Sequence, residues 1–345
     1  MKKKEKLIFV VANNGSDTRV IKELKTLSKE YDLLFIGITS RRIDNIVAKY
    51  AFKIKRIPFS HKNIFSYIFL NFLLIQTKVF YKIKKMHVVD EQVWIFLFHN
   101  FLIYDTVLDI YDSYFLKLNL QGEKAQLVKS IVYGTVKKII VTDKERLSLL
   151  PLKYQKKTYI IPNYPLKCDL PKTKISKKKN KLTVGYFGTL AEKRGGEIVE
   201  KLLLNSNIKV ISGGWIADSF SMGLTKNVNY YFLGEIKQKE VLDIIANKVD
   251  FLMSCYPENN INNIYASPNK IWDALACGKP IIINDGAKIS SFVKENNLGI
   301  VINYNNFKSE DLYNEMLSFK KKLIQIDKSK YLWDNYENTL IGLHL

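Results

Sequence analysis

The sequence predicts an α/β protein built from two doubly wound domains, each with a parallel sheet. Short apolar runs alternate with amphipathic stretches of helical period, which is the pattern of a parallel sheet covered on both faces. With 345 residues, 47% of them hydrophobic, the chain is long enough for two cores. A basic segment without apolar periodicity divides it near the middle. We therefore expect two Rossmann-like units in one chain.

The first half, residues 1–165, is expected to form the N-terminal domain. Residues 17–31 carry Val20, Leu24, Leu27 and Tyr31 at spacings of three and four, which predicts a helix with one buried face. The expected strands surround this helix and follow it, at residues 7–12, 33–38, 86–89, 106–110, 138–142 and 158–161.

Residues 166–181 carry a lysine cluster and Pro171, which indicates a solvated basic linker. A second Rossmann-like domain is expected over residues 182–328, and a C-terminal helix over residues 329–345. The expected strands of the second domain are residues 183–187, 208–212, 228–233, 250–254 and 280–283.

Composition excludes several classes of protein. Three cysteines lie far apart without CxxC spacing, so neither a disulfide framework nor a zinc site is predicted. The apolar residues 7–12 are too few for a signal peptide, and the longest apolar run, residues 64–75, is shorter than the roughly 20 residues that span a bilayer. We expect a cytoplasmic protein without a transmembrane segment.

The charge is strongly basic, with 54 Lys and Arg against 33 Asp and Glu, or +21 in total. Such a balance favours an anionic partner: nucleic acid, anionic lipid or a phosphorylated substrate. Richness in lysine, asparagine and isoleucine is also what an AT-rich genome produces. Since the chain has no recognisable RNA- or DNA-binding motif, no nucleic-acid partner is expected.

Residues 62–85 (KNIFSYIFLNFLLIQTKVFYKIKK) read as a helix with a broad apolar, aromatic surface and lysines at both ends. This composition is typical of an interfacial helix on an anionic membrane. A core helix of the first domain would have the same apolar content. Both interpretations stay open.

Residues 267–280 (SPNKIWDALACGKP) predict a helix followed by a buried strand. Ser267 is expected to cap the helix, Pro268 to take its first position and Gly278 to end it. The free N–H groups and the positive dipole at the start of such a helix bind anions. Lys270 and Asp273 share a face and would offer a cation to phosphate and a carboxylate to ribose hydroxyls, or else form an ordinary surface ion pair.

Residues 185–195 (GYFGTLAEKRG) predict a strand, a glycine-bearing turn and a helix from about Gly196, the shape of a phosphate-binding loop. Gly188 would let the backbone approach a ligand. Lys193 and Arg194 would neutralise charge on a departing diphosphate, so that no metal is needed. The alternative is a tight turn without a ligand.

Residues 13–19 (NNGSDTR) lie between the first strand and the first helix, where α/β sheets place ligands. Gly15 suits a close backbone approach to a ligand, while Asp17 is expected to cap the helix.

These motifs together resemble glycosyltransferase family 4, whose second domain carries a helix of the form SPNK-hydrophobic-x-E-x-x-A-x-G-x-P. The resemblance implies the GT-B architecture: two Rossmann-like domains facing each other across a cleft, with the nucleotide on the second and the last helix crossing back to the first. Asp273 stands at the family's ribose-binding glutamate, and Tyr265 stands where the family has another glutamate.

Two further positions depart from the family pattern. Thr189 stands where the family has an arginine, and Tyr111 replaces a histidine in the pattern formed by Asp109, Tyr111 and Asp112. Tyrosine can donate a hydrogen bond but is no near-neutral base. The resemblance and the motifs together give two sets of candidate residues: catalytic Tyr111, Asp112, Lys193 and Arg194, and nucleotide-binding Gly15, Gly188, Thr189, Ser267, Asn269, Lys270 and Asp273.

The expected activity is that of an enzyme moving a sugar from a nucleotide diphosphate sugar to a lipid-linked surface-glycan acceptor, as in capsule or lipopolysaccharide synthesis. Retention of configuration is implied by the resemblance, and the nucleotide sugar is a co-substrate beside which no cofactor or metal is expected. Work at the inner face of the cell membrane would suit such an acceptor. The alternative is a non-catalytic glycosyltransferase-like subunit, suggested by Thr189, Tyr111 and Tyr265.

Overall fold

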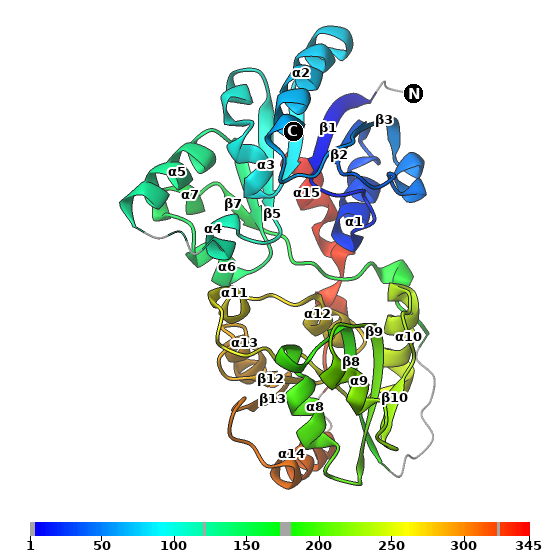
Figure 1. Cartoon of the computed structure of the whole chain (residues 1–345). Coiled ribbons are helices and arrows are strands. Elements are labelled where there is room, and N and C mark those ends of the chain that lie inside the picture. Colours follow the sequence, from blue (N-terminus) through cyan, green and yellow to red (C-terminus); the bar gives the residue numbers. More distant parts are fainter. Residues whose placement is uncertain (1–3, 119, 121, 173–180, 323–324) are drawn as a thin grey trace. The chain divides into compact units, whose positions relative to one another are not determined.

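The computed structural model describes residues 4–118, 120, 122–172, 181–322 and 325–345 (Figure 1). The chain forms two compact units. Unit 1 comprises Met1–Pro162 and Asn335–Leu345, and unit 2 comprises Asn163–Asp334. Both are α/β units with a parallel sheet, as the sequence predicts.

The sheet of unit 1 has seven strands in the order β3-β2-β1-β4-β5-β6-β7, all paired in parallel. The chain builds outward from β1 to β3, then returns to add β4 beside β1, which makes the sheet doubly wound. The strands are β1 Glu5–Val11, β2 Tyr31–Ile38, β3 Ala51–Ile57, β4 Lys85–Val89, β5 Asp105–Ile110, β6 Lys138–Val141 and β7 Thr158–Ile160.

Helices cover this sheet (Figure 1). They are α1 Thr18–Leu27, α2 Ile64–Tyr81, α3 Glu91–Ile95, α4 Tyr114–Lys117, α5 Glu123–Gly134, α6 Lys144–Ser148, α7 Leu152–Gln155 and α15 Glu337–Gly342, with 3-10 turns η1 Asn45–Lys49 and η2 Phe98–Leu102. Asp17 caps α1 by accepting from the N–H of Arg19 at 2.8 Å, which confirms the predicted cap. The helix ends before Tyr31 because that residue opens β2.

Unit 2 has a six-stranded parallel sheet in the order β10-β9-β8-β11-β12-β13. Its strands are β8 Leu182–Leu190, β9 Ile208–Ile216, β10 Tyr230–Phe232, β11 Phe251–Met253, β12 Ile281–Asn284 and β13 Gly299–Ile302. Its helices are α8 Gly196–Leu202, α9 Ser219–Leu224, α10 Gln238–Lys248, α11 Ile261–Ile264, α12 Asn269–Ala276, α13 Ser290–Glu295 and α14 Ser309–Lys321, with 3-10 turns at Lys167–Asp169, Glu192–Arg194 and Lys328–Tyr331. A further 3-10 turn, Trp333–Tyr336, begins in unit 2 and ends in unit 1.

Two strands are absent from the sequence-based prediction. β3 (AFKIKRI) is the edge strand of its sheet, and its lysines and arginine give it no clear apolar run. β13 (GIVI) is four residues long and begins with a glycine. A strand that is short or on an edge buries less apolar surface, so its sequence signal is weaker.

The ends of the units differ from the predicted boundaries. The Pro165 carbonyl accepts from the N–H of Trp333 at 2.9 Å, and the N–H of Lys167 donates to Asp334 at 2.8 Å, so residues from Asn163 onward pack within unit 2. Residues 173–180 of the predicted linker lie outside the described residues.

The predicted C-terminal helix, residues 329–345, is wrong in its length. Two 3-10 turns precede α15, because Leu332 takes an extended conformation between them and Trp333 is fully buried. α15 packs on α1, where Glu337 accepts from Lys29 at 2.5 Å and from Thr26 at 3.3 Å.

Candidate functional site

The carboxyl ends of β8 and β9 in unit 2 approach each other at backbone contact. Gly188 pairs with Gly214, and both have positive φ, +96° and +133°. A Cβ on Gly214 would lie 2.0 Å from the Gly188 carbonyl oxygen. Only glycine fits such an approach. Since the strands are parallel, this edge also receives the ends of β11 and β12.

Lys270, the second residue of α12, lies directly against Gly188. A Cβ on Gly188 would stand 3.3 Å from Lys270 Cε and 3.8 Å from its Nζ. The amino group lies 5.7 Å from the ring centroids of both Tyr186 and Tyr256, at cation–π distance. Within the described part of the chain no carboxylate lies at ion-pair distance from it. The structure thus brings together the cation and the glycine of two separate predicted motifs.

The start of α12 differs from the prediction by one residue. Pro268 is the N-cap, with φ −67° and ψ 132°, so Asn269 is the first helical residue and the predicted cap at Ser267 is wrong. The Ser267 hydroxyl instead accepts from Trp272 Nε1 at 3.3 Å. The Asn269 side chain accepts from Asn163 at 2.6 Å. Gly278, with φ +70°, ends the helix as predicted.

Asp273 is buried at 6% exposure on the same helix. One carboxylate oxygen accepts from Gln238 Nε2 at 2.8 Å, and Gln238 is the first residue of α10. The loop before α10 is fixed to β9, because the Gly234 carbonyl accepts from the N–H of Gly214 at 2.8 Å. Gln238 was missed by sequence reasoning, since an amide at the start of a helix carries no motif of its own.

The loop after β8 is held by Tyr186, which is 1% exposed. Its hydroxyl accepts from the N–H of Ala191 at 3.2 Å and lies 3.2 Å from the Arg194 carbonyl, to which it can donate. Lys193 is 61% exposed and pairs with Glu197 at 2.5 Å, while Arg194 is exposed. Thr189 is half-buried and lies opposite Trp215.

In unit 1, Gly15 is required by packing. Its φ is +84°, and a Cβ there would lie 2.4 Å from Val47 Cγ2 and 3.2 Å from Phe35. The Asn13 side chain accepts from the Gly15 N–H at 2.8 Å and so closes the turn. The loop therefore needs this glycine even without a ligand.

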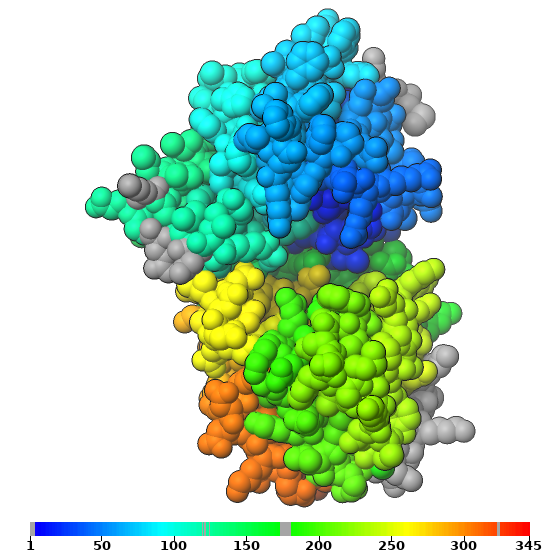
Figure 2. All heavy atoms as spheres, viewed as in Figure 1, coloured from blue at the N-terminus to red at the C-terminus, as the bar shows by residue number. Residues whose placement is uncertain are grey.

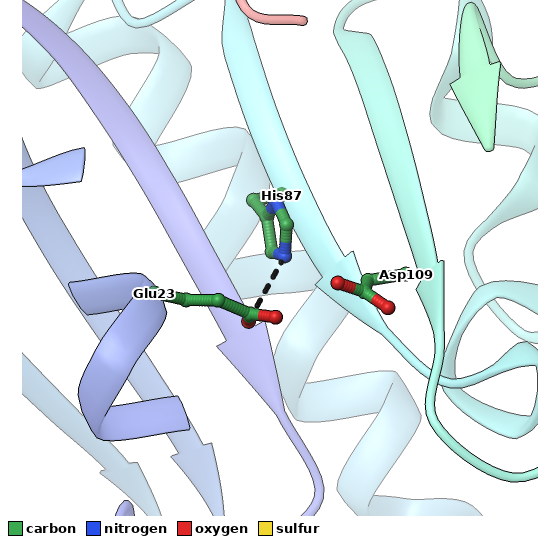
Figure 3. Close-up of side chains that lie close together, drawn as sticks. All are labelled: Glu23, His87 and Asp109. Atoms are coloured by element: carbon green, nitrogen blue, oxygen red, sulfur yellow. Dashed lines mark ion pairs between the residues drawn. The ribbon is translucent and has the colours of Figure 1, made fainter. Parts of the chain in front are cut away.

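A buried charged cluster of unit 1 lies where α1, β4 and β5 meet, and Figure 3 shows three of its members, Glu23, His87 and Asp109. Arg19 donates to Glu23 at 2.9 Å, to Asp109 at 2.8 Å and to the Ile161 carbonyl at 2.8 Å. Burial, opposed by Arg19 and reinforced by Glu23, raises the pKa of Asp109 to about 8. At neutral pH one arginine thus faces two carboxyl groups that hold a proton between them.

Glu23, His87 and Asp109 place their ligand atoms within 4.8 Å of one another, a spacing that a metal ion could use. Arg19 already contacts both carboxylates of this group. A metal cation would be repelled by the guanidinium and would have to displace its hydrogen bonds. The cluster therefore fits a structural ion-pair network better than a metal site.

Tyr111 and Asp112 follow β5 and are tied to unit 1. The Tyr111 hydroxyl donates to Glu23 at 2.5 Å, and burial raises the pKa of Tyr111 well above its usual range. Burial also raises the pKa of Asp112, but Arg146 at 3.1 Å and Lys117 at 3.3 Å outweigh it and hold that pKa below its ordinary value. Asp112 is thus ionised at neutral pH, and Tyr111 is protonated.

His87 is a core residue of unit 1, with a fully buried side chain. Its Nδ1 lies 3.1 Å from Nε2 of His344, and its Nε2 lies 3.4 Å from Glu23 without hydrogen-bond geometry (Figure 3). Burial lowers the pKa of His87 to about 4, so the ring is neutral at pH 7 and its contact with Glu23 is no charged pair.

This pKa predicts a loss of stability in acid. The unfolded chain binds a proton at His87 near pH 6.5 and the folded chain only near pH 4, so stability falls as pH drops through this window, by roughly 3 kcal/mol. In His87→Gln this part of the pH dependence is expected to vanish, as measured by urea unfolding at several pH values. The exposed His99→Gln should keep the wild-type profile. Parallel curves for wild type and His87→Gln would contradict the assignment.

Comparison with known proteins finds similarity in structure alone. No protein-family model matches the sequence, and no curated protein matches it. Solved structures match over nearly the whole chain at low identity. HepE from Anabaena in complex with UDP matches with a TM-score of 0.67 and 12% identity, covering 98% of this chain and 95% of that one.

Two further matches come from proteins of different description. WaaG, a glycosyltransferase involved in lipopolysaccharide biosynthesis, has a TM-score of 0.61 and 12% identity and covers 98% of this chain and 97% of its own. A putative UDP-N-acetylglucosamine 2-epimerase from Listeria monocytogenes has a TM-score of 0.67 and 10% identity, with 99% and 95% covered. At these identities the likeness concerns the fold. This chain, with its two parallel-sheet Rossmann-like units, has the GT-B fold of glycosyltransferases such as WaaG.

Proposed function

We propose that this protein transfers a glycosyl unit from a nucleotide diphosphate sugar to an acceptor, with the nucleotide bound by unit 2. The observation that carries the proposal is Lys270, whose amino group lies beside Gly188 at the start of α12 without a carboxylate partner among the described residues. The first N–H groups of a helix have no acceptor within it, and a lysine among them adds full charge. This combination suits a diphosphate.

The proposed donor is a UDP-sugar. HepE has been solved with UDP, with UDP and glucose, and with UDP-glucose, and it shares the fold of this chain. Asp273 lies on the same helix as Lys270 and accepts a hydrogen bond from Gln238. We propose that it also accepts hydrogen bonds from the ribose hydroxyls. Gly188 and Gly214 would let the ligand approach the backbone where the strands end.

In the proposed reaction the bond from the anomeric carbon to the diphosphate oxygen breaks, and negative charge develops on the leaving diphosphate. Lys270 and the start of α12 would stabilise that charge, with Lys193 and Arg194 as further cations. We propose that these groups take the place of a metal ion, so that activity persists in EDTA.

We further propose that the anomeric configuration is retained and that the diphosphate accepts the proton of the acceptor hydroxyl. Tyr111 supports this assignment, because its hydroxyl donates to Glu23 and its raised pKa makes it unsuitable as a base at neutral pH. Asp112, ionised and paired with Arg146, would orient groups near it.

The proposed acceptor is a lipid-linked surface glycan at the inner face of the membrane. The similarity in fold to WaaG, with its part in lipopolysaccharide biosynthesis, supports a glycan acceptor. The net charge of +21 supports work beside anionic lipid.

The nucleotide site is tested by calorimetry with UDP and UDP-glucose. Lys270→Met is expected to weaken binding about 10- to 100-fold, because a charge-assisted hydrogen bond to phosphate contributes about 1.5–3 kcal/mol. Lys209→Met is the matched control. Lys209 also lies near a tyrosine ring, that of Tyr231 on β10 at 5.9 Å, but it stands near the start of β9, at the opposite end of that strand from Gly214. Equal affinities for wild type and Lys270→Met would refute the site.

Turnover is tested by incubating the protein with labelled UDP-sugar and a lipid-linked acceptor. Transfer of label to the acceptor is the expected result. An epimerised nucleotide sugar would instead favour the activity named for the Listeria protein. Nucleotide binding without any product would favour a non-catalytic subunit.

A further inference from the structure

Helix α2 of unit 1 has two different faces. Its inner face packs into the core through Ser66, Tyr67, Leu70, Leu74 and Thr77, which are buried. Hydrogen bonds fix this face in place: the Tyr67 hydroxyl donates to the His61 carbonyl at 2.8 Å, and the Tyr104 hydroxyl donates to the Leu74 carbonyl at 2.6 Å. The core-helix interpretation of this segment is therefore confirmed for one side of the helix.

The opposite side of α2 is apolar and open. Its large side chains are between 52% and 76% exposed and recur every three or four residues, so they form one continuous stripe. This stripe, named the outer face, consists of Ile64, Phe65, Ile68, Phe69, Phe72, Ile75, Val79 and Phe80. In Figure 2 the light-blue α2 segment lies uncovered at the top of unit 1.

The turn η2 extends the outer face. Phe98, Phe101 and Leu102 are 39%, 44% and 80% exposed. Asn100 in the same turn donates to Asn71 of α2 at 2.8 Å, so η2 and α2 are fixed side by side. A contiguous apolar patch of this size on a soluble unit indicates a partner surface.

The charge around the outer face indicates what kind of partner it binds. Residues 45–89 contain nine lysines and arginines and neither aspartate nor glutamate. Lys62 precedes α2, and Lys82 and Lys84 follow it, all exposed. An apolar, aromatic stripe flanked by lysines complements an anionic bilayer: the stripe contacts the acyl chains, and the lysines pair with the lipid phosphates.

The packing of α2 on the core of unit 1 determines whether the helix can cross a bilayer or lies on its surface. With 18 residues of mean hydropathy 1.4, the helix is long and apolar enough by length and composition to cross a membrane. Crossing would require its inner face to leave the core and the hydrogen bonds to Tyr104 and Asn100 to break. A helix anchored on one side and apolar on the other lies in the plane of the interface instead.

A cavity of about 340 Å³ opens at the start of α2. It lies among the loops that follow β3, β4 and β5, at the carboxyl edge of the sheet, where α/β units bind ligands. Its lining combines polar His61, Lys62, Gln92 and Tyr114 with apolar Ile64 and Leu118. Lys62 also flanks the outer face and Ile64 is part of it, so the cavity adjoins that face.

We propose that the outer face of α2 docks on an anionic bilayer with the helix in the plane of the interface, which places the mouth of this cavity at the lipid head groups. Docking itself follows from the surface of unit 1. The assignment of the cavity to the phosphorylated head of a lipid-linked acceptor rests on the proposed function.

Flotation with vesicles tests the docking. The full chain is expected to float with phosphatidylcholine vesicles that contain about 30% phosphatidylglycerol, and to bind them less tightly as salt rises. Phe69→Glu/Phe72→Glu should weaken partitioning at least about tenfold, since two charges enter the apolar stripe. Lys62→Gln/Lys84→Gln should weaken it by about fivefold per lysine at low salt. The matched control is Leu204→Glu/Val228→Glu, two sites on unit 2 that are 79% and 84% exposed.

Three results would overturn the proposal: no binding to anionic vesicles, equal binding to pure phosphatidylcholine, or a dimer in solution that Phe69→Glu/Phe72→Glu dissociates. The last would make the outer face an interface between two copies of the chain. Thermal unfolding of each variant checks its fold. UDP binding, measured without vesicles, reports on the proposed function separately, so the two proposals fail independently.

Discussion

Arg19→Met is expected to lower the free energy of unfolding of unit 1 by about 3–5 kcal/mol. Arg19 is 1% exposed and gives the buried Glu23 and Asp109 their cation. Methionine fills a similar volume but leaves the one carboxylate charge that Glu23 and Asp109 share without its cation, and the Ile161 carbonyl without its donor. Urea unfolding followed by circular dichroism measures the change.

The charge balance of the cluster provides the control. Asp109→Asn leaves Arg19 paired with Glu23, so the buried charges still cancel and the loss should be smaller than for Arg19→Met. Lys29→Met removes the half-exposed pair with Glu337 and should cost less than about 1 kcal/mol. If Asp109→Asn destabilised unit 1 as much as Arg19→Met does, the contribution of the cluster to stability would come from the geometry of its hydrogen bonds and not from the balance of its charges.

Gly214→Ala is expected to have the second largest effect, with a loss of about 2–4 kcal/mol in unit 2 and of nucleotide binding. The new Cβ would stand 2.0 Å from the Gly188 carbonyl oxygen, at a φ of +133° that alanine adopts only with strain. The ends of β8 and β9 must then separate, which moves Gly188 away from Lys270. Thermal unfolding and calorimetry with UDP measure the two losses.

A second glycine of unit 2 serves as the control. Gly223 lies inside α9, and a Cβ there would meet no atom within 4 Å among the described residues. Gly223→Ala should therefore stabilise unit 2 by up to about 1 kcal/mol, because alanine favours the helix. Similar stabilities for the two variants would show that the close approach of β8 and β9 is easily relaxed.

The fold was accessible from the sequence because its buried strands are continuous apolar runs. β1, β2 and β12 each contain such a run, and each expected strand overlaps one in the structure. The helix α12 also follows from local signals, with a proline at its start and Gly278 at its end. The error of one residue at Ser267 arises because a proline can occupy the cap as well as the first helical position.

The site was accessible in part. Gly188 and Lys270 lie in motifs that local chemistry marks, and the parallel sheet brings the ends of those motifs together. Hydrogen-bond and ion-pair partners that come from distant parts of the chain lie in no recognisable motif. The pairing of Asp273 with Gln238 and that of Arg19 with Asp109 depend on tertiary packing, which a single sequence does not encode in any local pattern.

The contact between His87 and His344 has a consequence for biosynthesis. His87 lies on β4 in the core of unit 1, and its ring contacts that of His344, which follows α15. All of unit 2 is synthesised between these two histidines. β4 is therefore translated before unit 2, whereas the residue that packs against its histidine is translated after unit 2, so unit 1 completes this part of its core only once unit 2 has been made.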